Sequence, residues 1–166
     1  MKIVIMSDTH GNRDIIEKVK SYYPEADTYI HCGDSELAAN DVVLQDVHKV
    51  GGNCDHDAAY EDDVLLETGG TKLYITHGHL YNVKSSLMTL AYRAEEVGAD
   101  IVCFGHSHVL GVEKIHSTLF INPGSLKSPR GRKEKTFVFL EIIGDTYSVK
   151  CLDEHNNLLD VFQYSV

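Results

Sequence analysis

The chain has 166 residues, of which 43% are hydrophobic and 24% are charged. This composition is typical of a globular protein, and the length suits one domain, which we expect to span residues 1–166. Fifteen basic and 25 acidic residues give a formal net charge of −10. That charge argues against extended binding to nucleic acid or to an anionic membrane, because both require a basic surface.

The cysteines and the N-terminus bear on the cellular compartment. The four cysteines are scattered without C-x-x-C spacing, so a disulfide framework is not expected. The apolar run at residues 3–6 is too short for a signal peptide, and no apolar run approaches the roughly 18 residues of a membrane span. We therefore expect a cytoplasmic protein that does not bind a membrane.

Apolar patterns predict an alternation of strands and helices, followed by strands alone. In chain order, they predict a strand over 3–6, a helix over 13–23, a strand over 28–31, a short helix near 35–45, strands over 47–50, 64–67 and 72–76, a helix over 87–97, and strands over 101–104, 109–115, 118–122, 135–143, 146–152 and 158–164. Gly69 and Gly70 indicate a hairpin, and Gly98 ends the second helix. The mixed beginning and the β-rich end predict an α/β fold, built as a layered sheet or sandwich with helices outside.

Five predicted strands are each followed, within about four positions, by side chains that can bind a metal ion. In the order of the strands, these side chains are Asp8 and His10, Asp34, Asn53, His77 and His79, and His106 and His108. Ligands of open α/β sheets bind outside the carboxyl ends of the strands, so five loops from a single sheet would converge on one edge. Glycines lie among these residues, where the backbone turns sharply or comes close: Gly11, Gly33, Gly51, Gly52, Gly78 and Gly105.

Any one of these motifs alone is more often a polar turn or a solvated loop, so their joint order carries the metal hypothesis. The donors number seven, namely Asp8, His10, Asp34, Asn53, His77, His106 and His108. Seven donors are too many for one ion and suit two ions that share a bridging carboxylate. Mixed imidazole and oxygen donors favour manganese, iron or zinc over calcium or magnesium. Because no cysteine occupies a clear ligand position, a structural zinc finger is disfavoured.

These motifs also carry a family resemblance. Five ordered motifs resemble the signature of the calcineurin-like metallophosphoesterases, namely D-T-H (8–10), G-D (33–34), G-N-C-D (52–55), T-H-G-H (76–79) and G-H-S-H (105–108). The motif N-P-G-S (122–125) resembles the branch of small bacterial and archaeal phosphodiesterases. The resemblance implies a four-layer α/β/β/α sandwich and a divalent-metal-dependent hydrolase acting on phosphodiesters.

The same resemblance implies a role for each metal-binding side chain. By it, a first ion is held by Asp8, His10 and His108, a second by Asn53, His77 and His106, and Asp34 bridges both. Manganese is the metal that the family implies, although iron, nickel, cobalt or zinc also suit these ligands. The implied mechanism is attack on phosphorus by a metal-bridging hydroxide. Cyclic nucleotides, nucleic-acid ends, phospholipid headgroups and other small phosphodiesters all remain open as substrates, and a homodimer or higher homo-oligomer is expected.

One position departs from the family pattern. Cys54 stands where larger relatives usually carry a histidine that is proposed to protonate the leaving group. A thiol with a pKa of about 8.5 is a weaker acid for that role. His79 and His56 are the alternative donors, and Asp55 is expected to steady a nearby histidine or the loop. Candidate catalytic residues are therefore Asp34, Asn53, His79 and Asp55, and we expect faster hydrolysis of aryl phosphodiesters than of alkyl monoesters.

The loop over 127–135 holds five basic residues and one acidic residue in an otherwise acidic chain. Arg130 and Arg132 are candidates for binding a second phosphate or the leaving group, and a solvated loop is the alternative. Away from the motifs, His31 is expected to pack in the core as a neighbour of the ligands. The same pattern predicts solvated side chains at His48, His116 and His155 and buried ones at Cys32 and Cys103.

A second function remains open on the same fold. The phosphoesterase-like subunit of retromer serves as a scaffold, so a non-catalytic metal-binding or scaffold module is the alternative to an enzyme. All seven ligand positions of this chain carry competent side chains, which favours the enzyme.

Overall fold

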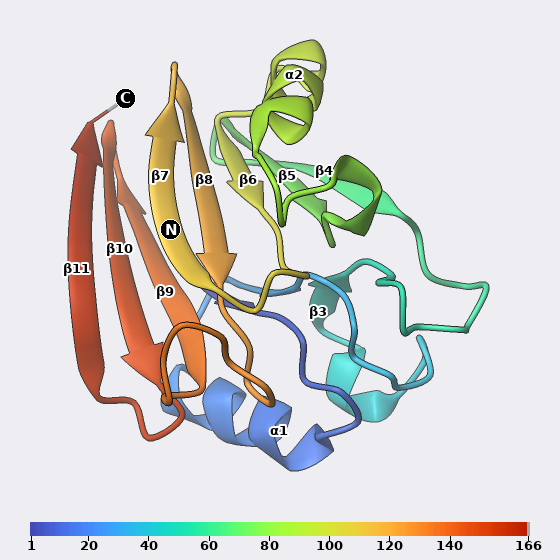
Figure 1. Cartoon of the computed structure of the whole chain (residues 1–166). Coiled ribbons are helices and arrows are strands. Elements are labelled where there is room, and N and C mark those ends of the chain that lie inside the picture. The colour runs from blue at the N-terminus through green and yellow to red at the C-terminus, as the bar shows by residue number, and fades with distance from the viewer. Residues whose placement is uncertain (166) are drawn as a thin grey trace.

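The computed structural model describes residues 1–165, so Val166, the last residue of the predicted domain, lies outside the described residues. Within residues 1–165, eleven strands form two sheets (Figure 1). The six-stranded sheet has the order β11-β10-β9-β1-β2-β3, with β1 (Lys2–Met6), β2 (Thr28–His31), β3 (Val47–Lys49), β9 (Thr136–Ile143), β10 (Thr146–Asp153) and β11 (Leu158–Ser165). The five-stranded sheet has the order β4-β5-β6-β8-β7, with β4 (Asp63–Thr68), β5 (Thr71–Thr76), β6 (Ile101–Cys103), β7 (Leu110–Ile115) and β8 (Thr118–Pro123).

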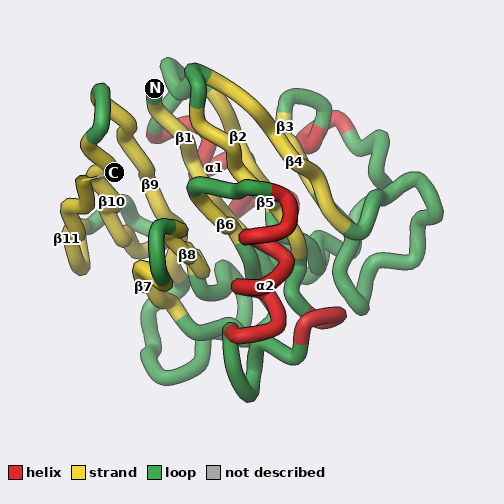
Figure 2. The backbone as a smooth tube through the Cα atoms, turned by 90° about the horizontal axis from the view of Figure 1, so that it is seen from above, coloured by secondary structure: helices red, strands yellow, loops and turns green. Residues whose placement is uncertain are grey.

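Side-chain alternation along the strands builds four layers. On β1, Ile3 and Ile5 join a core cluster that also contains β5, β6 and β8, so the two sheets pack face to face. Val4 and Met6 point the other way and pack with helix α1 (Arg13–Tyr22). Phe120 of β8 packs with helix α2 (Met88–Val97) on the outer face of the five-stranded sheet. Figure 2 shows α2 lying over that sheet. The predicted α/β/β/α sandwich is confirmed.

Both predicted long helices form, and their ends have local causes. Asn12 caps α1 by accepting a hydrogen bond from the Ile15 N–H at 3.2 Å. Gly98 ends α2 in a left-handed conformation with φ of 67°. None of the described helices has the length and apolar character needed to cross a membrane.

The prediction of a short helix near 35–45 is wrong, because only the 3-10 turn η1 (Val42–Leu44) forms there. The backbone N–H groups of Glu36 and Ala39 donate instead to the side chains of Asp55 and Asp57, at 2.7 and 2.9 Å. These carboxylates come from about twenty residues further along the chain, and they hold the segment in an irregular path.

The five site-bearing strands are divided between the two sheets, so the assumption of a single sheet is wrong. β1, β2 and β3 run parallel in one sheet, and β5 and β6 run parallel in the other. Their carboxyl ends still meet, because the stacked sheets end on the same side. The N–H of Asp8, after β1, donates to Gly33 O after β2, and the N–H of His106, after β6, donates to Asp8 Oδ2 at 3.1 Å. One edge of the sandwich therefore collects all five loops.

Candidate metal centre

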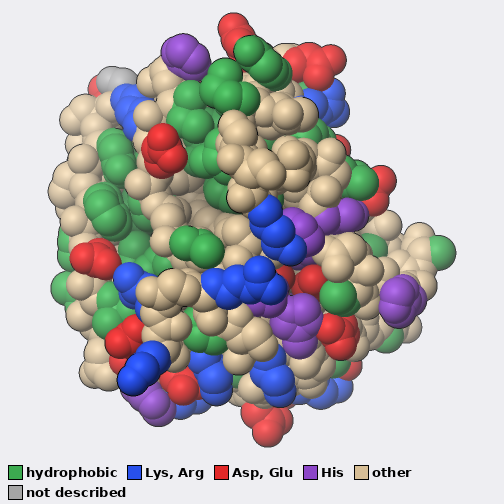
Figure 3. Space-filling view, viewed as in Figure 1, with side chains coloured by type: hydrophobic (Ala, Val, Ile, Leu, Met, Phe, Trp, Pro, Cys, Tyr) green, Lys and Arg blue, Asp and Glu red, His purple; other side chains and the backbone are tan. Residues whose placement is uncertain are grey.

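Acidic and histidine side chains form two compact groups at this edge, and His10 also belongs to a third, more exposed group with Glu36 and Cys54. Within each group the ligand atoms lie within 4.8 Å of one another, and the two compact groups are Asp8, His10 and His108, and Asp8, Asp34 and His77. The first group is the predicted ligand set of the first ion. Asp8 belongs to both groups, whereas the sequence hypothesis gave the shared position to Asp34. Figure 3 shows histidines and acidic side chains gathered on one face beside lysine and arginine side chains.

The two oxygens of the buried Asp8 carboxylate face different partners. Oδ2 accepts hydrogen bonds from Ser7 Oγ at 2.6 Å and from the His106 N–H at 3.1 Å. Oδ1 lies 3.0 Å from His108 Nε2 and 3.3 Å from His77 Nε2. Burial alone raises the pKa of Asp8, but the hydrogen bonds from these two histidines and the charge of His77 outweigh it and lower the pKa. The protein therefore fixes one oxygen and presents the other, ionised, to the histidines.

The two histidines of the first group have their tautomers set by carbonyl and carboxylate acceptors. His108 Nδ1 lies 2.8 Å from Ser128 O, which can only accept, so Nδ1 carries the proton. His10 Nδ1 lies 2.5 Å from Glu36 Oε1. Metal-binding histidines typically form such a hydrogen bond from the ring nitrogen that does not bind the metal. The Nε2 atoms of these two rings lie 3.4 Å apart.

Asp34 is buried and lies between the loops after β3 and β5. Its Oδ2 is 3.5 Å from His77 Nε2, and its Oδ1 accepts from the Cys54 N–H at 2.8 Å. Asp55 holds this loop in place, because its Oδ2 accepts from the N–H groups of Asp34 and Gly52 at 2.7 and 2.8 Å. Asp55 thus steadies the loop, which makes it a positioning residue.

Two further predicted ligands, Asn53 and His106, lie beside these groups and belong to neither. Asn53 is exposed, and its Nδ2 donates to Cys54 Sγ at 3.3 Å. The His106 ring lies 5.0 Å from the His77 ring between centroids. Burial, with smaller contributions from His77 and Lys84, lowers the pKa of His106 to about 4, so its ring is neutral at pH 7. Their roles as ligands stay predictions.

Unusual backbone conformations concentrate at the predicted ligands. Five of the seven have positive φ although they are not glycine: Asp8 (53°), His10 (43°), Asp34 (53°), His106 (66°) and His108 (59°). Each such residue costs on the order of 1–3 kcal/mol, and such residues cluster at functional sites. Glycines make room between the loops, because a Cβ on Gly52 would lie 2.1 Å from Asp34 Oδ1 and one on Gly105 would lie 2.0 Å from Ser7 Oγ. The predicted close approach is confirmed at these two glycines.

The candidate proton donors for the leaving group are weak acids or lie outside the two groups. Burial and the neighbouring Asp34 raise the pKa of the Cys54 thiol to about 11. His79 begins the 3-10 turn η2 (His79–Tyr81), and its Nδ1 lies 3.1 Å from His77 Nδ1. Burial, followed by the charge of His77, lowers the pKa of His79. His56 is exposed. The raised pKa of Cys54 and the lowered pKa of His79 make both side chains poor proton donors at neutral pH.

The two arginines of the basic loop have different surroundings. The Arg130 N–H donates to His108 O at 2.9 Å, and the Arg130 side chain reaches the mouth of a cavity beside the histidines. Arg132 turns toward β11, where its Nη2 lies 3.8 Å from Asp160 Oδ2. Sequence reasoning missed Lys84, which lies at the same cavity mouth as Arg130. It also missed Glu36, whose contact with His10 spans 26 residues of sequence and has no local signal.

The predictions for the remaining histidines and cysteines are confirmed. His31 is buried, and its Nε2 lies 3.0 Å from Thr9 Oγ1. Cys32 and Cys103 are buried. His48, His116 and His155 are exposed, as predicted.

Comparison with known proteins settles the family. The model of the calcineurin-like phosphoesterase superfamily domain matches residues 1–145. The chain belongs to this superfamily. It is 40% identical over 167 residues to the probable metallophosphoesterase YsnB of Bacillus subtilis, covering 100% of this chain and 99% of that protein. It is 30% identical over 145 residues to a phosphodiesterase of Methanocaldococcus jannaschii, covering 75% and 83%.

Two solved structures share the fold of this chain. A predicted phosphoesterase from Streptococcus pneumoniae is 34% identical, covers 99% of this chain and 97% of its own, and superposes with a TM-score of 0.95. Vps29 of Entamoeba histolytica, solved in complex with Zn²⁺, is 19% identical, with coverage of 99% of each chain and a TM-score of 0.78. The latter likeness concerns the fold alone. The family binds divalent metal ions, and this chain has the side chains for it.

Proposed function

We propose that this chain is a phosphodiesterase that depends on two divalent metal ions and hydrolyses small phosphodiesters. The observation that carries the proposal is the pair of ligand groups joined at Asp8, with the Nε2 atoms of three histidines turned toward one carboxylate. Similarity to the phosphodiesterase of Methanocaldococcus jannaschii supports the same activity.

The donor set fits divalent transition ions. Imidazole nitrogens and carboxylate oxygens in one cluster suit manganese, iron, cobalt, nickel or zinc, and we propose manganese. The residues that would hold the first ion are Asp8, His10 and His108, those that would hold the second are Asn53, His77 and His106, and Asp34 would be shared by both. When bound, two such ions stabilise charge on the phosphoryl oxygens and lower the pKa of water.

The residues of the chain prepare this site in three ways. Ser128 and Glu36 fix the orientation of His108 and His10, so their Nε2 atoms are ready to bind. Asp55 fixes the Asp34 loop. Arg130, next to His108, places a positive charge where an anionic ester would dock.

Weak proton donors around the site define the preferred leaving group. The Cys54 thiol has a pKa raised to about 11, and His79 has a lowered pKa, so neither protonates a departing alkoxide efficiently at neutral pH. We therefore propose that the enzyme prefers esters with acidic leaving groups, such as aryl phosphodiesters.

Metal analysis combined with hydrolysis of bis-p-nitrophenyl phosphate tests this proposal. The wild-type chain should bind metal and hydrolyse the diester, and Asp34→Asn should lose most of the activity. Asp145→Asn makes the same chemical change in an exposed hairpin and serves as the matched control. Activity that survives Asp34→Asn would refute the proposed site. Metal binding without any hydrolysis would favour the alternative of a non-catalytic module.

A further inference from the structure

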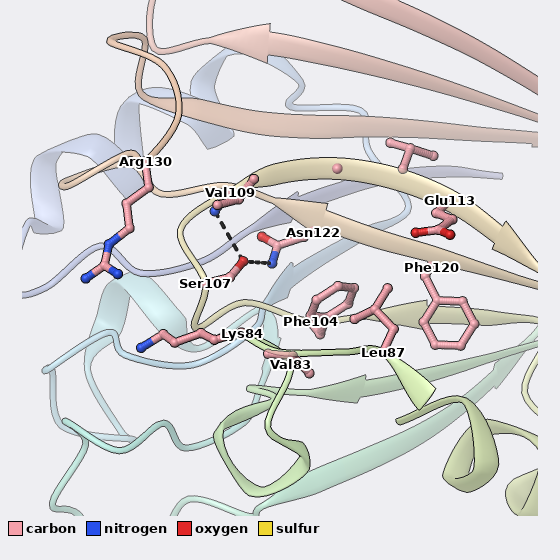
Figure 4. A pocket seen from close by; sticks show the side chains of 12 residues that line it. Val83, Lys84, Leu87, Phe104, Ser107, Val109, Glu113, Phe120, Asn122 and Arg130 are labelled. Atoms are coloured by element: carbon pink, nitrogen blue, oxygen red, sulfur yellow. Dashed lines mark hydrogen bonds between the residues drawn. The ribbon is translucent and has the colours of Figure 1, made fainter. Parts of the chain in front are cut away.

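A cavity of about 510 Å³ opens beside the metal-ligand loops (Figure 4). Ser107, which stands between His106 and His108 in the sequence, forms part of its wall. Asn122 Nδ2 ties this wall to β8 by donating to Gly105 O at 3.0 Å and to Ser107 Oγ at 2.9 Å. The cavity therefore shares a loop with the candidate metal centre.

The interior of the cavity is largely apolar and aromatic. Phe104 and Phe120 line it together with Val83 and Leu87. Its volume falls within the range of about 300–1,000 Å³ that is usual for small-molecule sites. Rings of this kind favour a flat, uncharged group, because they bury its apolar surface and stack on its face.

The two ends of the cavity carry side chains of opposite charge. Figure 4 shows Arg130 and Lys84 at one end and Glu113 at the other, with the apolar side chains between them. The basic end is the one next to the histidines, because the Arg130 N–H donates to His108 O at 2.9 Å and Ser107, between His106 and His108, lines the same cavity. An anionic phosphate is thus favoured at the histidine end, and a second anionic group is disfavoured near Glu113.

We propose that this cavity binds an uncharged aromatic ester group of the substrate while the phosphate lies at the metal centre. The inference rests on the proposed phosphodiesterase function and narrows its substrate class to diesters with an aryl or similarly flat ester group. Alkyl monoesters and dialkyl diesters leave the cavity unfilled and bind more weakly.

Gly111 offers a way to fill the cavity without disturbing the metal ligands. It lies on β7 opposite Asn122, on the same face as Phe120, and it lines the cavity. A Cβ built there meets nothing within 4 Å, and its φ is not in the left-handed region. A larger side chain in a strand is compatible with the fold, because glycine weakens strands. Gly111→Phe should therefore fold, and Gly111→Leu is the smaller second variant.

The test measures binding of diphenyl phosphate and dimethyl phosphate to Mn²⁺-loaded protein by calorimetry. The wild-type chain should bind diphenyl phosphate about 10- to 100-fold more tightly, as burial of one aromatic ring predicts. Gly111→Phe should remove most of this preference, and Gly111→Leu should remove part of it. Leu65→Phe adds a ring at an exposed position of β4, the other edge strand of the same sheet, and should keep the preference.

The outcomes separate this inference from the proposed function. If the wild-type chain hydrolyses bis-p-nitrophenyl phosphate but binds both phosphates equally, the cavity assignment is overturned and the phosphodiesterase stands. The same holds if a folded Gly111→Phe protein, verified by its melting temperature, keeps the wild-type preference. If the wild-type chain hydrolyses no diester, both proposals fail together.

Discussion

Asp55 connects the stability of the site loops to metal binding, and Asp55→Asn tests that connection. In the native chain, Asp55 Oδ2 accepts hydrogen bonds from the backbone N–H groups of Asp34 and Gly52, and Asp55 Oδ1 accepts one from the Glu36 N–H at 2.7 Å. An asparagine has one accepting oxygen, so at least one N–H loses its partner and the remaining bonds lose their charge. Hydrogen bonds to charged groups contribute about 1.5–3 kcal/mol each, so we expect a loss of about 3–5 kcal/mol in the free energy of unfolding.

Urea unfolding in the presence of a chelator measures this loss, and calorimetry measures the affinity for Mn²⁺. Affinity should fall by about 10- to 100-fold, because the loop that positions Asp34 is loosened. Asp57→Asn is the matched control, since Asp57 also accepts backbone N–H groups, from Ala39 and Ala59, but touches no predicted ligand. Wild-type stability and metal affinity in Asp55→Asn would refute the reasoning, as would equal losses of metal affinity in both variants.

Three further predictions address other parts of the molecule. Burial lowers the pKa of His31 to about 4, so the unfolded chain takes up this proton first as the pH falls. In metal-free protein, His31 should not lower the free energy of unfolding above about pH 6.5, and it should lower it by about 3 kcal/mol between pH 6.5 and pH 4. A His31→Gln variant whose stability depends on pH as the wild type's does would contradict this. Arg130→Ala should raise KM for bis-p-nitrophenyl phosphate by about tenfold in steady-state assays. Arg132→Ala removes the same charge from a pair with Asp160 and should raise KM less. Equal increases in KM would count against a contact between Arg130 and the substrate. Cys54→His places a stronger acid beside Asp34, so the rate ratio of alkyl to aryl diesters should rise, and an unchanged ratio would show that the leaving group needs no donor at this position.

The sequence pattern was sufficient for the elements that depend on local alternation. On β1, apolar residues fill both faces because both are buried, and on α1 the spacing of Ile15, Ile16 and Val19 matches the buried stripe. The region near 35–45 could not be predicted in this way. Its backbone is held by the side chains of Asp55 and Asp57, and a contact with such distant residues leaves no local periodicity.

In the candidate site, too, the sequence predicted some features and not others. Ordered motifs after strands indicated the ligand side chains, and the structure brings Asp8, His10, Asp34, His77 and His108 together. The division of the strands between two sheets depends on packing between Ile5 and residues such as Ile75, which pattern alone does not encode. Glu36 and Lys84 were missed for a related reason, because a charged residue in an exposed loop has no signal until the fold places it.

The central claim is that hydrolysis requires two metal ions held around Asp8. The most direct test is to titrate Mn²⁺ into metal-stripped protein while following hydrolysis of bis-p-nitrophenyl phosphate. The account predicts that activity rises from baseline and saturates at two equivalents per chain, and that Asp8→Asn abolishes the rise because Asp8 belongs to both ligand groups. Full activity in the stripped protein, saturation at one equivalent, or an unaltered titration in Asp8→Asn would contradict it.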